Sequence, residues 1–275
     1  ELPPRPPAMI TAQSFHVPGP DRHETRDMFV WRPEGTVGSL PVLYMTDGFS
    51  GLTVVAHQIA PYINTGEAPP IMIVAAAARP STRVREYVPA YRSRNLSYER
   101  HRDWFLHVVI PWAEATQGAS TNRLQRGIGG YSNGADFAIA LAGERRDLFG
   151  LVFAQSPFNP RREWALSTSV SQRWLVTGGT WEPAAEMARL LGRQLSQYSA
   201  FRRICVGPWE HDVRAWRTLS RGNTMWLFGY TDLARTMASE REAQNCRDLV
   251  DQAPAPEEGP LHWRSVTATQ TSSAT

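Results

Sequence analysis

The chain has 275 residues, 42% of them hydrophobic and 20% charged, and its formal net charge is +3, a composition typical of a globular protein. All 29 basic residues are arginine, which excludes a Schiff-base lysine, a Ser–Lys dyad and a P-loop lysine. The small net charge and the lack of basic runs argue against nucleic-acid binding. The longest apolar runs fall far short of the ~20 residues that span a membrane.

Predicted strands and helices alternate along most of the chain. After a proline-rich lead-in over residues 1–9, apolar runs predict strands at 10–17, 26–31, 40–45, 71–77, 125–130, 149–154, 173–177 and 201–206. Periodicity predicts helices at 54–63, 102–115, 135–141, 183–198 and 213–226. A further helix is expected over 230–250, before a disordered tail over 251–275 that is rich in Pro, Ser and Thr.

This order of elements predicts one α/β domain over residues 10–229. Strands separated by helices form right-handed βαβ units, and so a mostly parallel central sheet with helices on both faces. The first two strands have no helix between them, which predicts an antiparallel N-terminal edge. Cys205 falls in a strand and Cys246 in the last helix. Both are expected to be free thiols, because two cysteines make no disulfide framework.

Residues 130–134 read Gly-Tyr-Ser-Asn-Gly, a G-x-S-x-G pattern between a predicted strand and a predicted helix. In a nucleophile elbow this pattern holds a serine hydroxyl out at the top of the sheet, and its glycines relieve the crowding of the sharp turn. Ser132 is therefore the candidate nucleophile. The pattern alone also fits a glycine-rich turn in another parallel-sheet protein.

A histidine is the usual proton acceptor for such a serine, because its unperturbed pKa lies near 6.5. In the α/β-hydrolase fold, which the elbow indicates, the order along the chain is serine, acid, histidine. Only His211 and His262 follow Ser132, and His262 lies in the expected tail. His211 follows a strand and opens a helix, so it is the candidate base. The alternative is a surface or helix-capping histidine.

The acid should lie between Ser132 and His211, on a loop that leaves a strand. Glu182 leaves the 173–177 strand and opens the next helix, which makes it the candidate. The alternative is a carboxylate stabilised by the helix N-terminus, and a dyad without an acid stays open. Four other carboxylates fit less well, because they follow the wrong strand, lie within a helix or flank the histidine itself: Glu163, Glu186, Glu210 and Asp212.

An oxyanion hole needs backbone N–H groups aimed at the developing negative charge. One is expected from Asn133, the residue after the nucleophile. The other is expected from the turn after the 40–45 strand, at Gly48 or Phe49. An ordinary strand-to-helix turn is the alternative there.

Four segments stand in an order that resembles a known family: 42–48 (VLYMTDG), 85–89 (REYVP), 130–134 (GYSNG) and 211–217 (HDVRAWR). Together they resemble the "Putative esterase" family, which includes esterase D, mycolyltransferases and the enterochelin-type siderophore esterases. The stretch 178–183 (GGTWEP) is most similar to the siderophore esterase branch and supports Glu182 as the acid. The resemblance covers residues 10–229 and implies a cofactor-free α/β-hydrolase catalytic domain that cleaves carboxylic esters.

Arginine and aromatic residues gather on the loops near the candidate catalytic positions. Loops at the carboxyl ends of the strands shape the pocket of an α/β sheet, so Arg85, Tyr87, Trp181 and Trp209 are expected to contact the substrate. Such side chains suit an anionic or aromatic group, for example a catecholate ester, through bidentate contacts and stacking. The alternative is a solvated loop with tryptophans packed beneath it.

We therefore expect a serine esterase that hydrolyses a small-molecule carboxylic ester, siderophore-type esters among them, through an acyl-enzyme and without a cofactor or metal. One alternative is an acyltransferase with the same residues, in which an alcohol replaces water. The other is a non-catalytic binding protein on the same scaffold. Nothing in the sequence selects an oligomeric state, or a cytoplasmic, periplasmic or secreted location.

Overall fold

The computed structural model describes residues 10–21, 23–89, 94–158, 172–196 and 201–250. Within them, nine strands form one sheet in the order β1-β2-β4-β3-β5-β6-β7-β8-β9. Their bounds are β1 (Gln13–Pro18), β2 (Thr25–Trp31), β3 (Val42–Met45), β4 (Met72–Ala76), β5 (Arg126–Tyr131), β6 (Leu151–Gln155), β7 (Arg173–Gly179), β8 (Phe201–Gly207) and β9 (Cys246–Val250). Strands β3 to β8 are parallel, while β1 and β2 pair antiparallel at the N-terminal edge. The predicted mostly parallel sheet with an antiparallel N-terminal edge is confirmed.

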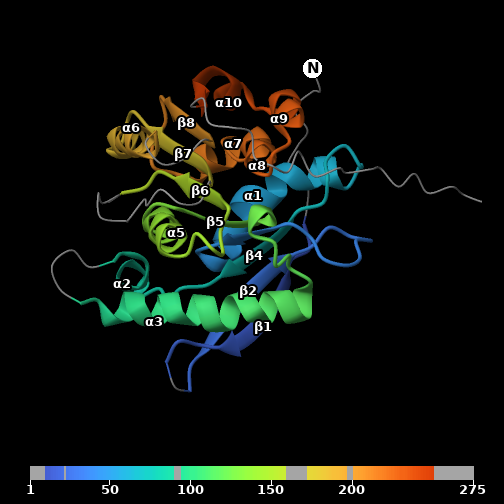
Figure 1. Cartoon of the computed structure of the whole chain (residues 1–275), viewed down its shortest axis with the longest axis vertical. Coiled ribbons are helices and arrows are strands. Elements are labelled where there is room, and N and C mark those ends of the chain that lie inside the picture. The colour runs from blue at the N-terminus through green and yellow to red at the C-terminus, as the bar shows by residue number, and fades with distance from the viewer. Residues whose placement is uncertain (1–9, 22, 90–93, 159–171, 197–200, 251–275) are drawn as a thin grey trace, which may run out of the picture.

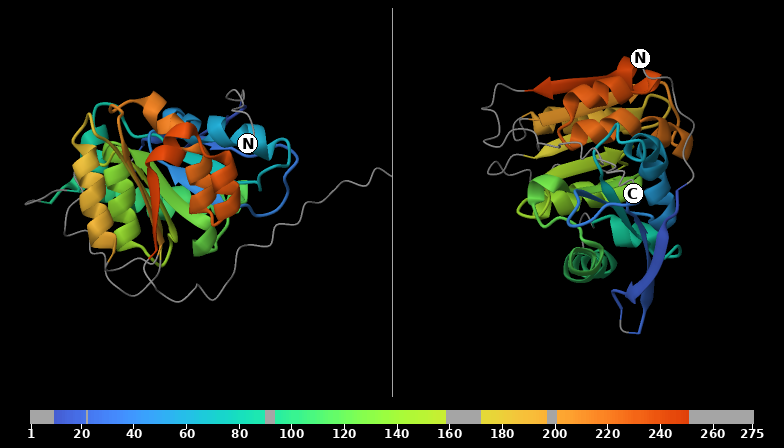
Figure 2. Two further views of the ribbon diagram at one scale, coloured as in Figure 1. Left: turned by 90° about the horizontal axis from the view of Figure 1, so that it is seen from above. Right: turned by 90° about the vertical axis from the view of Figure 1, so that its right-hand side faces the viewer.

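Helices cover both faces of the sheet (Figures 1 and 2). Their bounds are α1 (Gly48–Ile63), α2 (Arg83–Tyr87), α3 (Leu96–Trp104), α4 (Ile110–Trp112), α5 (Asn133–Glu144), α6 (Ala184–Leu195), α7 (Val213–Thr218), α8 (Arg221–Leu227), α9 (Thr231–Met237) and α10 (Glu240–Asn245). The π-helical turns η1 (Phe105–Val109) and η2 (Ala113–Gln117) extend α3 and α4, and a short 3₁₀ turn, η3 (Arg123–Gln125), precedes β5. One core cluster holds side chains of α3, α5 and α6, and the other holds those of α1, α7, α8 and α9.

Strand β3 shows why the central strands appear in the sequence as unbroken apolar runs. Val42 and Tyr44 belong to one core cluster, and Leu43 and Met45 to the other. Every residue of the strand is buried, as expected for a parallel sheet that is covered on both faces. The carboxyl ends of these parallel strands share one edge of the sheet, which is where the candidate site lies. None of the described helices is both long and apolar enough to cross a membrane.

The segment 230–250 differs from the single helix that was predicted. It forms α9, α10 and the strand β9, which pairs antiparallel with β8. A capping box between Ser239 and Glu242 starts α10, which is only six residues long. Strand β9 then hydrogen-bonds with β8, whose outer edge would otherwise be left without a partner strand. Helical periodicity does not predict this strand, because β9 pairs with β8, which lies far away in the sequence.

Cys205 and Cys246 stand opposite each other in the β8–β9 ladder and form a disulfide across 41 residues of sequence. The expectation of two free thiols is wrong, because two cysteines form a single bridge without any larger framework when the fold places them opposite each other in neighbouring strands. Figure 2 shows β9 and β1 at opposite edges of the sheet, in agreement with the strand order. The predicted lead-in over 1–9 and tail over 251–275, with His262, lie outside the described residues.

Candidate active site

Ser132 lies in a strained turn between β5 and α5. Its backbone has φ 56° and ψ −132°, a conformation that non-glycine residues rarely adopt and that clusters at functional sites. A Cβ atom on Gly130 or Gly134 would lie 2.4 Å or 2.1 Å from Oγ1 of Thr46. Only glycine fits at these two positions, so the G-x-S-x-G pattern follows from how closely this turn approaches the end of β3.

The Glu182 carboxylate contacts the His211 ring. Its Oε2 forms a short hydrogen bond with Nδ1 of His211, while Oε1 accepts the Ser156 hydroxyl at 2.6 Å and the Gly179 N–H at 2.9 Å. The Glu182 side chain is only 3% exposed. Burial alone would raise the pKa of this carboxyl, but the hydrogen bonds from His211, Ser156 and Gly179 outweigh burial and lower its pKa. Glu182 is therefore ionised at neutral pH, as the partner of a catalytic histidine must be.

Ser156 is a contributor to this site that the sequence reasoning missed. It directly follows β6, is fully buried and has a φ of 48°. Its hydroxyl donates to Glu182 and accepts the indole N–H of Trp216 at 3.0 Å. The sequence shows a serine directly after a buried strand, and that strand pairs with β5, which leads into Ser132. The residue type alone does not indicate a function at this position.

Aromatic contacts connect the His211 ring with the elbow. The ring meets Trp216 edge-on, with the ring centroids 5.0 Å apart, and Trp216 stacks on Tyr131, the residue before Ser132, at 4.2 Å. Phe158 also packs on His211, with the ring centroids 5.9 Å apart. In the described part of the chain no hydrogen bond joins the Ser132 hydroxyl to the histidine ring. Such bonds often tighten only when substrate is bound.

The residues predicted to form an oxyanion hole lie at two helix N-termini. Helix α5 begins at Asn133 and helix α1 at Gly48, so Asn133, Gly48 and Phe49 all lie in first turns, where N–H groups have no intrahelical partner. The turn before α1 is left-handed at both Asp47 (φ 66°) and Gly48 (φ 54°). A Cβ atom on Gly134 would lie 2.9 Å from the Asp47 carboxylate, so the two turns are in contact.

The predicted substrate residues divide into two groups. Trp181, which is 67% exposed, and Trp209 line one cavity of about 430 Å³ beside His211, together with Arg214 and Arg241. Tyr87 is instead wholly buried and cannot line a substrate pocket. Arg85 is exposed but does not reach this cavity.

The other carboxylates considered for the acid are placed elsewhere. Glu186 is exposed on α6 and pairs with Arg193, Glu210 is exposed, and Asp212 caps α7 through the Ala215 N–H. Glu163 lies outside the described residues. Over the described ranges, no group of three or more His, Cys, Asp and Glu side chains could hold a metal ion.

The chain matches a known family in sequence and is similar in fold to several solved structures. Residues 23–237 match the family model described as "Putative esterase", and no curated protein sequence matches the chain. The structure is similar to the siderophore hydrolase EstA from Aspergillus nidulans, with a TM-score of 0.62 and 16% identity over 79% of this chain and 94% of that one. It is also similar to the enterobactin esterase FES from Shigella flexneri, with a TM-score of 0.63 and 18% identity over 84% of this chain and 61% of that one.

A third similar structure is the ferulic acid esterase AmCE1/Fae1A from Anaeromyces mucronatus, with a TM-score of 0.58 and 19% identity over 82% of this chain and 92% of that one. At these identities the similarity is one of fold. The predicted α/β-hydrolase fold is thereby confirmed.

Proposed function

This chain belongs to the "Putative esterase" family, and we propose that it hydrolyses carboxylic esters through a triad of Ser132, His211 and Glu182. The observation that supports this most directly is the hydrogen bond between Glu182 and Nδ1 of His211, made between loops that leave the neighbouring strands β7 and β8. An ionised carboxylate on Nδ1 keeps that nitrogen protonated. Nε2 is then free to accept a proton.

In the first half-reaction, Ser132 Oγ attacks the carbonyl carbon of the ester while Nε2 of His211 takes the hydroxyl proton. The N–H groups of Asn133 and of Gly48 or Phe49 hold the negative oxygen of the tetrahedral intermediate. The intermediate collapses, the alcohol leaves with the proton from His211, and the acyl group remains on Ser132. Water then attacks this ester by the same route, which releases the acid and restores the serine.

The proposed substrate class is small esters that carry an aromatic or anionic group, siderophore-type esters among them. The exposed Trp181 lines a cavity with Arg214 and Arg241 next to the His211 loop, and such side chains bind aromatic rings and anions. The names of similar structures, a siderophore hydrolase and an enterobactin esterase, point the same way. Trp181→Ala should lower kcat/KM about 2- to 10-fold for a catechol-bearing ester. If Trp181→Ala lowered kcat/KM for an aliphatic acetate ester by the same factor, Trp181 would not select aromatic groups.

The decisive test is covalent labelling with a fluorophosphonate probe, read by intact mass. Wild type should gain one adduct and Ser132→Ala none, and Ser132→Ala should lower kcat by roughly 10⁴- to 10⁶-fold. Ser120→Ala is the control, since Ser120 lies before β5, at the other end of that strand from Ser132. No adduct on wild type would favour a binding protein. Products analysed with added alcohols would separate an acyltransferase from an esterase.

A further inference from the structure

Helix α2 holds the turn that leads into α1. The hydroxyl of Tyr87 accepts the backbone N–H of Asp47 at 2.9 Å. Arg83, one turn earlier on the same helix, binds the Asp47 carboxylate through Nε and through a second N–H at 2.9 Å. Its guanidinium lies 5.1 Å from the centre of the Tyr87 ring. One short helix thus fixes both the backbone and the side chain of a single turn residue.

The conformation of Asp47 explains why such support is needed. The left-handed region is unfavourable for residues other than glycine, although less so for Asp than for most, and a residue persists there where its surroundings hold it. Asp47 has this conformation, and so does the glycine after it. These two residues set the direction in which the chain enters α1, and hence where the N–H groups of Gly48 and Phe49 lie relative to the elbow.

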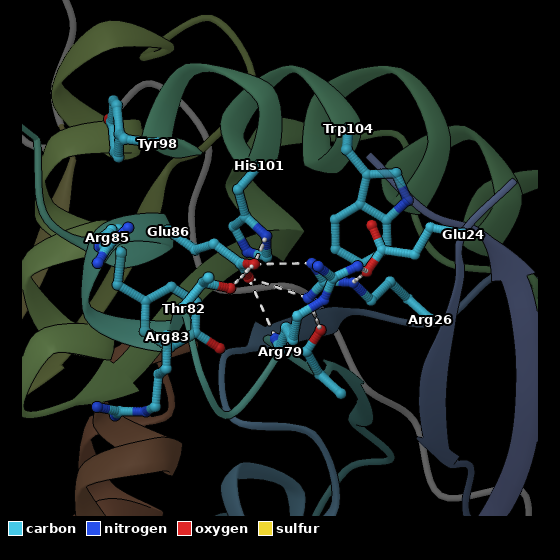
Figure 3. Close-up of polar contacts among 12 residues, drawn as sticks. Glu24, Arg26, Arg79, Thr82, Arg83, Arg85, Glu86, Tyr98, His101 and Trp104 are labelled. Carbon is cyan, nitrogen blue, oxygen red and sulfur yellow. Dashed lines mark hydrogen bonds and ion pairs between the residues drawn. The ribbon is translucent and has the colours of Figure 1, made fainter. Parts of the chain in front are cut away.

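Helix α2 has only five residues, too few to be stable alone. A buried ionic cluster around Glu86 stabilises it. The Glu86 carboxylate accepts two N–H groups of Arg26, at 2.9 and 2.7 Å, and the Thr82 hydroxyl at 2.7 Å, and it lies 3.3 Å from Nδ1 of His101. Figure 3 shows these groups converging on Glu86 while the side chain of Arg83 points away from them. Burial alone would raise the pKa of Glu86, but the contacts from His101, Arg26 and Thr82 hold it well below its ordinary value.

We propose that Tyr87 and Arg83 are positioning residues for ester hydrolysis, which hold the Asp47–Gly48 turn so that the N–H group of Gly48 or Phe49 meets the oxyanion. This inference rests on the proposed function, because it presupposes that the turn forms half of the oxyanion hole. Burial also raises the pKa of Tyr87 well above its ordinary value, so the phenol stays neutral. Without that hydroxyl, the Asp47 N–H would lose its partner and the left-handed turn could relax.

The test compares Tyr87→Phe with a matched control, Tyr98→Phe. Tyr98 is also buried, and both rings pack on Phe137, at 5.6 Å for Tyr87 and 6.0 Å for Tyr98. The Tyr98 hydroxyl, however, donates to Glu144, away from the turn. Tyr87→Phe should lower kcat for p-nitrophenyl acetate about 10- to 100-fold with KM unchanged, because only transition-state stabilisation is lost. Its rate of fluorophosphonate labelling should fall by the same factor, and Tyr98→Phe should behave as wild type.

The outcomes separate the two proposals. If wild type is not labelled at Ser132, the proposed function and this inference both fail. If wild type is labelled and Tyr87→Phe matches Tyr98→Phe in kcat and labelling rate, only the positioning role is overturned. Should Tyr87→Phe not fold, Arg83→Gln decides the matter, since the Arg83 side chain is 27% exposed and its loss leaves the core intact. An unchanged kcat in Arg83→Gln would overturn the inference.

Discussion

A Glu182→Gln substitution would keep the shape of the side chain and remove its charge. The amide oxygen of glutamine can still accept the Ser156 hydroxyl and the Gly179 N–H, as Oε1 of Glu182 does. The amide NH₂ group would then face Nδ1 of His211, which must become an acceptor. The ring proton would move to Nε2, and the histidine could no longer take the proton of Ser132.

The size of the effect follows from the bonds that are lost. Glu182 meets His211 with a charged and almost fully buried oxygen, and the wrong tautomer of a catalytic histidine lowers kcat by about 10⁴ in serine proteases. We expect a loss of about 10³- to 10⁴-fold here, equivalent to about 4–5.5 kcal/mol. The melting temperature should change little, because the substitution also removes the cost of burying a charge.

The assay is kcat on p-nitrophenyl acetate, measured beside thermal unfolding. Glu186→Gln is the control, because Glu186 lies four residues further along the chain with its side chain 65% exposed. It should retain the activity of wild type. If Glu182→Gln kept a kcat within about tenfold of wild type, Glu182 would not be the residue that orients the base.

Two further predictions concern stability. Removing the disulfide with Cys205→Ala and Cys246→Ala together should lower the free energy of unfolding by about 4 kcal/mol, the chain-entropy value for a loop of 41 residues. Urea unfolding of wild type and of the double variant, both without reductant, checks this, and equal stabilities would contradict it. Because the pKa of Glu86 is lowered by Arg26 and His101 among its contacts, the stability it contributes is complete above its unfolded pKa of about 4.3 and is lost as the pH falls below that value. Wild type should therefore lose stability in acid more steeply than Glu86→Gln in urea unfolding, and parallel pH profiles would refute the assignment.

The sheet and the candidate catalytic residues could be predicted because local features determine them. Ser132 needs a strained turn with glycines on both sides, and the sequence shows both glycines. Glu182 and His211 each follow a buried strand, and parallel strands bring such positions to one edge of the sheet. The hydrogen bond between them therefore agrees with an expectation based on chain order alone.

The orientation of Tyr87 could not be predicted in this way. The sequence predicts a loop over the pocket for its segment, where arginine and aromatic residues gather. The fold turns the ring inward, where it packs on His101 and Phe137, and the neighbouring Glu86 binds Arg26. That contact joins residues 60 positions apart, and no local pattern encodes it. The disulfide between Cys205 and Cys246 could not be predicted for the same reason, because the two residues are 41 positions apart.

The position of that disulfide decides how the protein would respond to a mechanical load. A pull applied from the C-terminal side would separate β9 from β8, beginning at the Val250–Phe201 pair and stopping at Cys246. The force would then pass through Cys205 into β8, two residues before the strand ends at Gly207 and the chain turns toward His211. A pull from the N-terminal side would load β1, at the opposite edge of the sheet. For immobilisation on a surface, attachment through the N-terminal side should therefore disturb the histidine loop least.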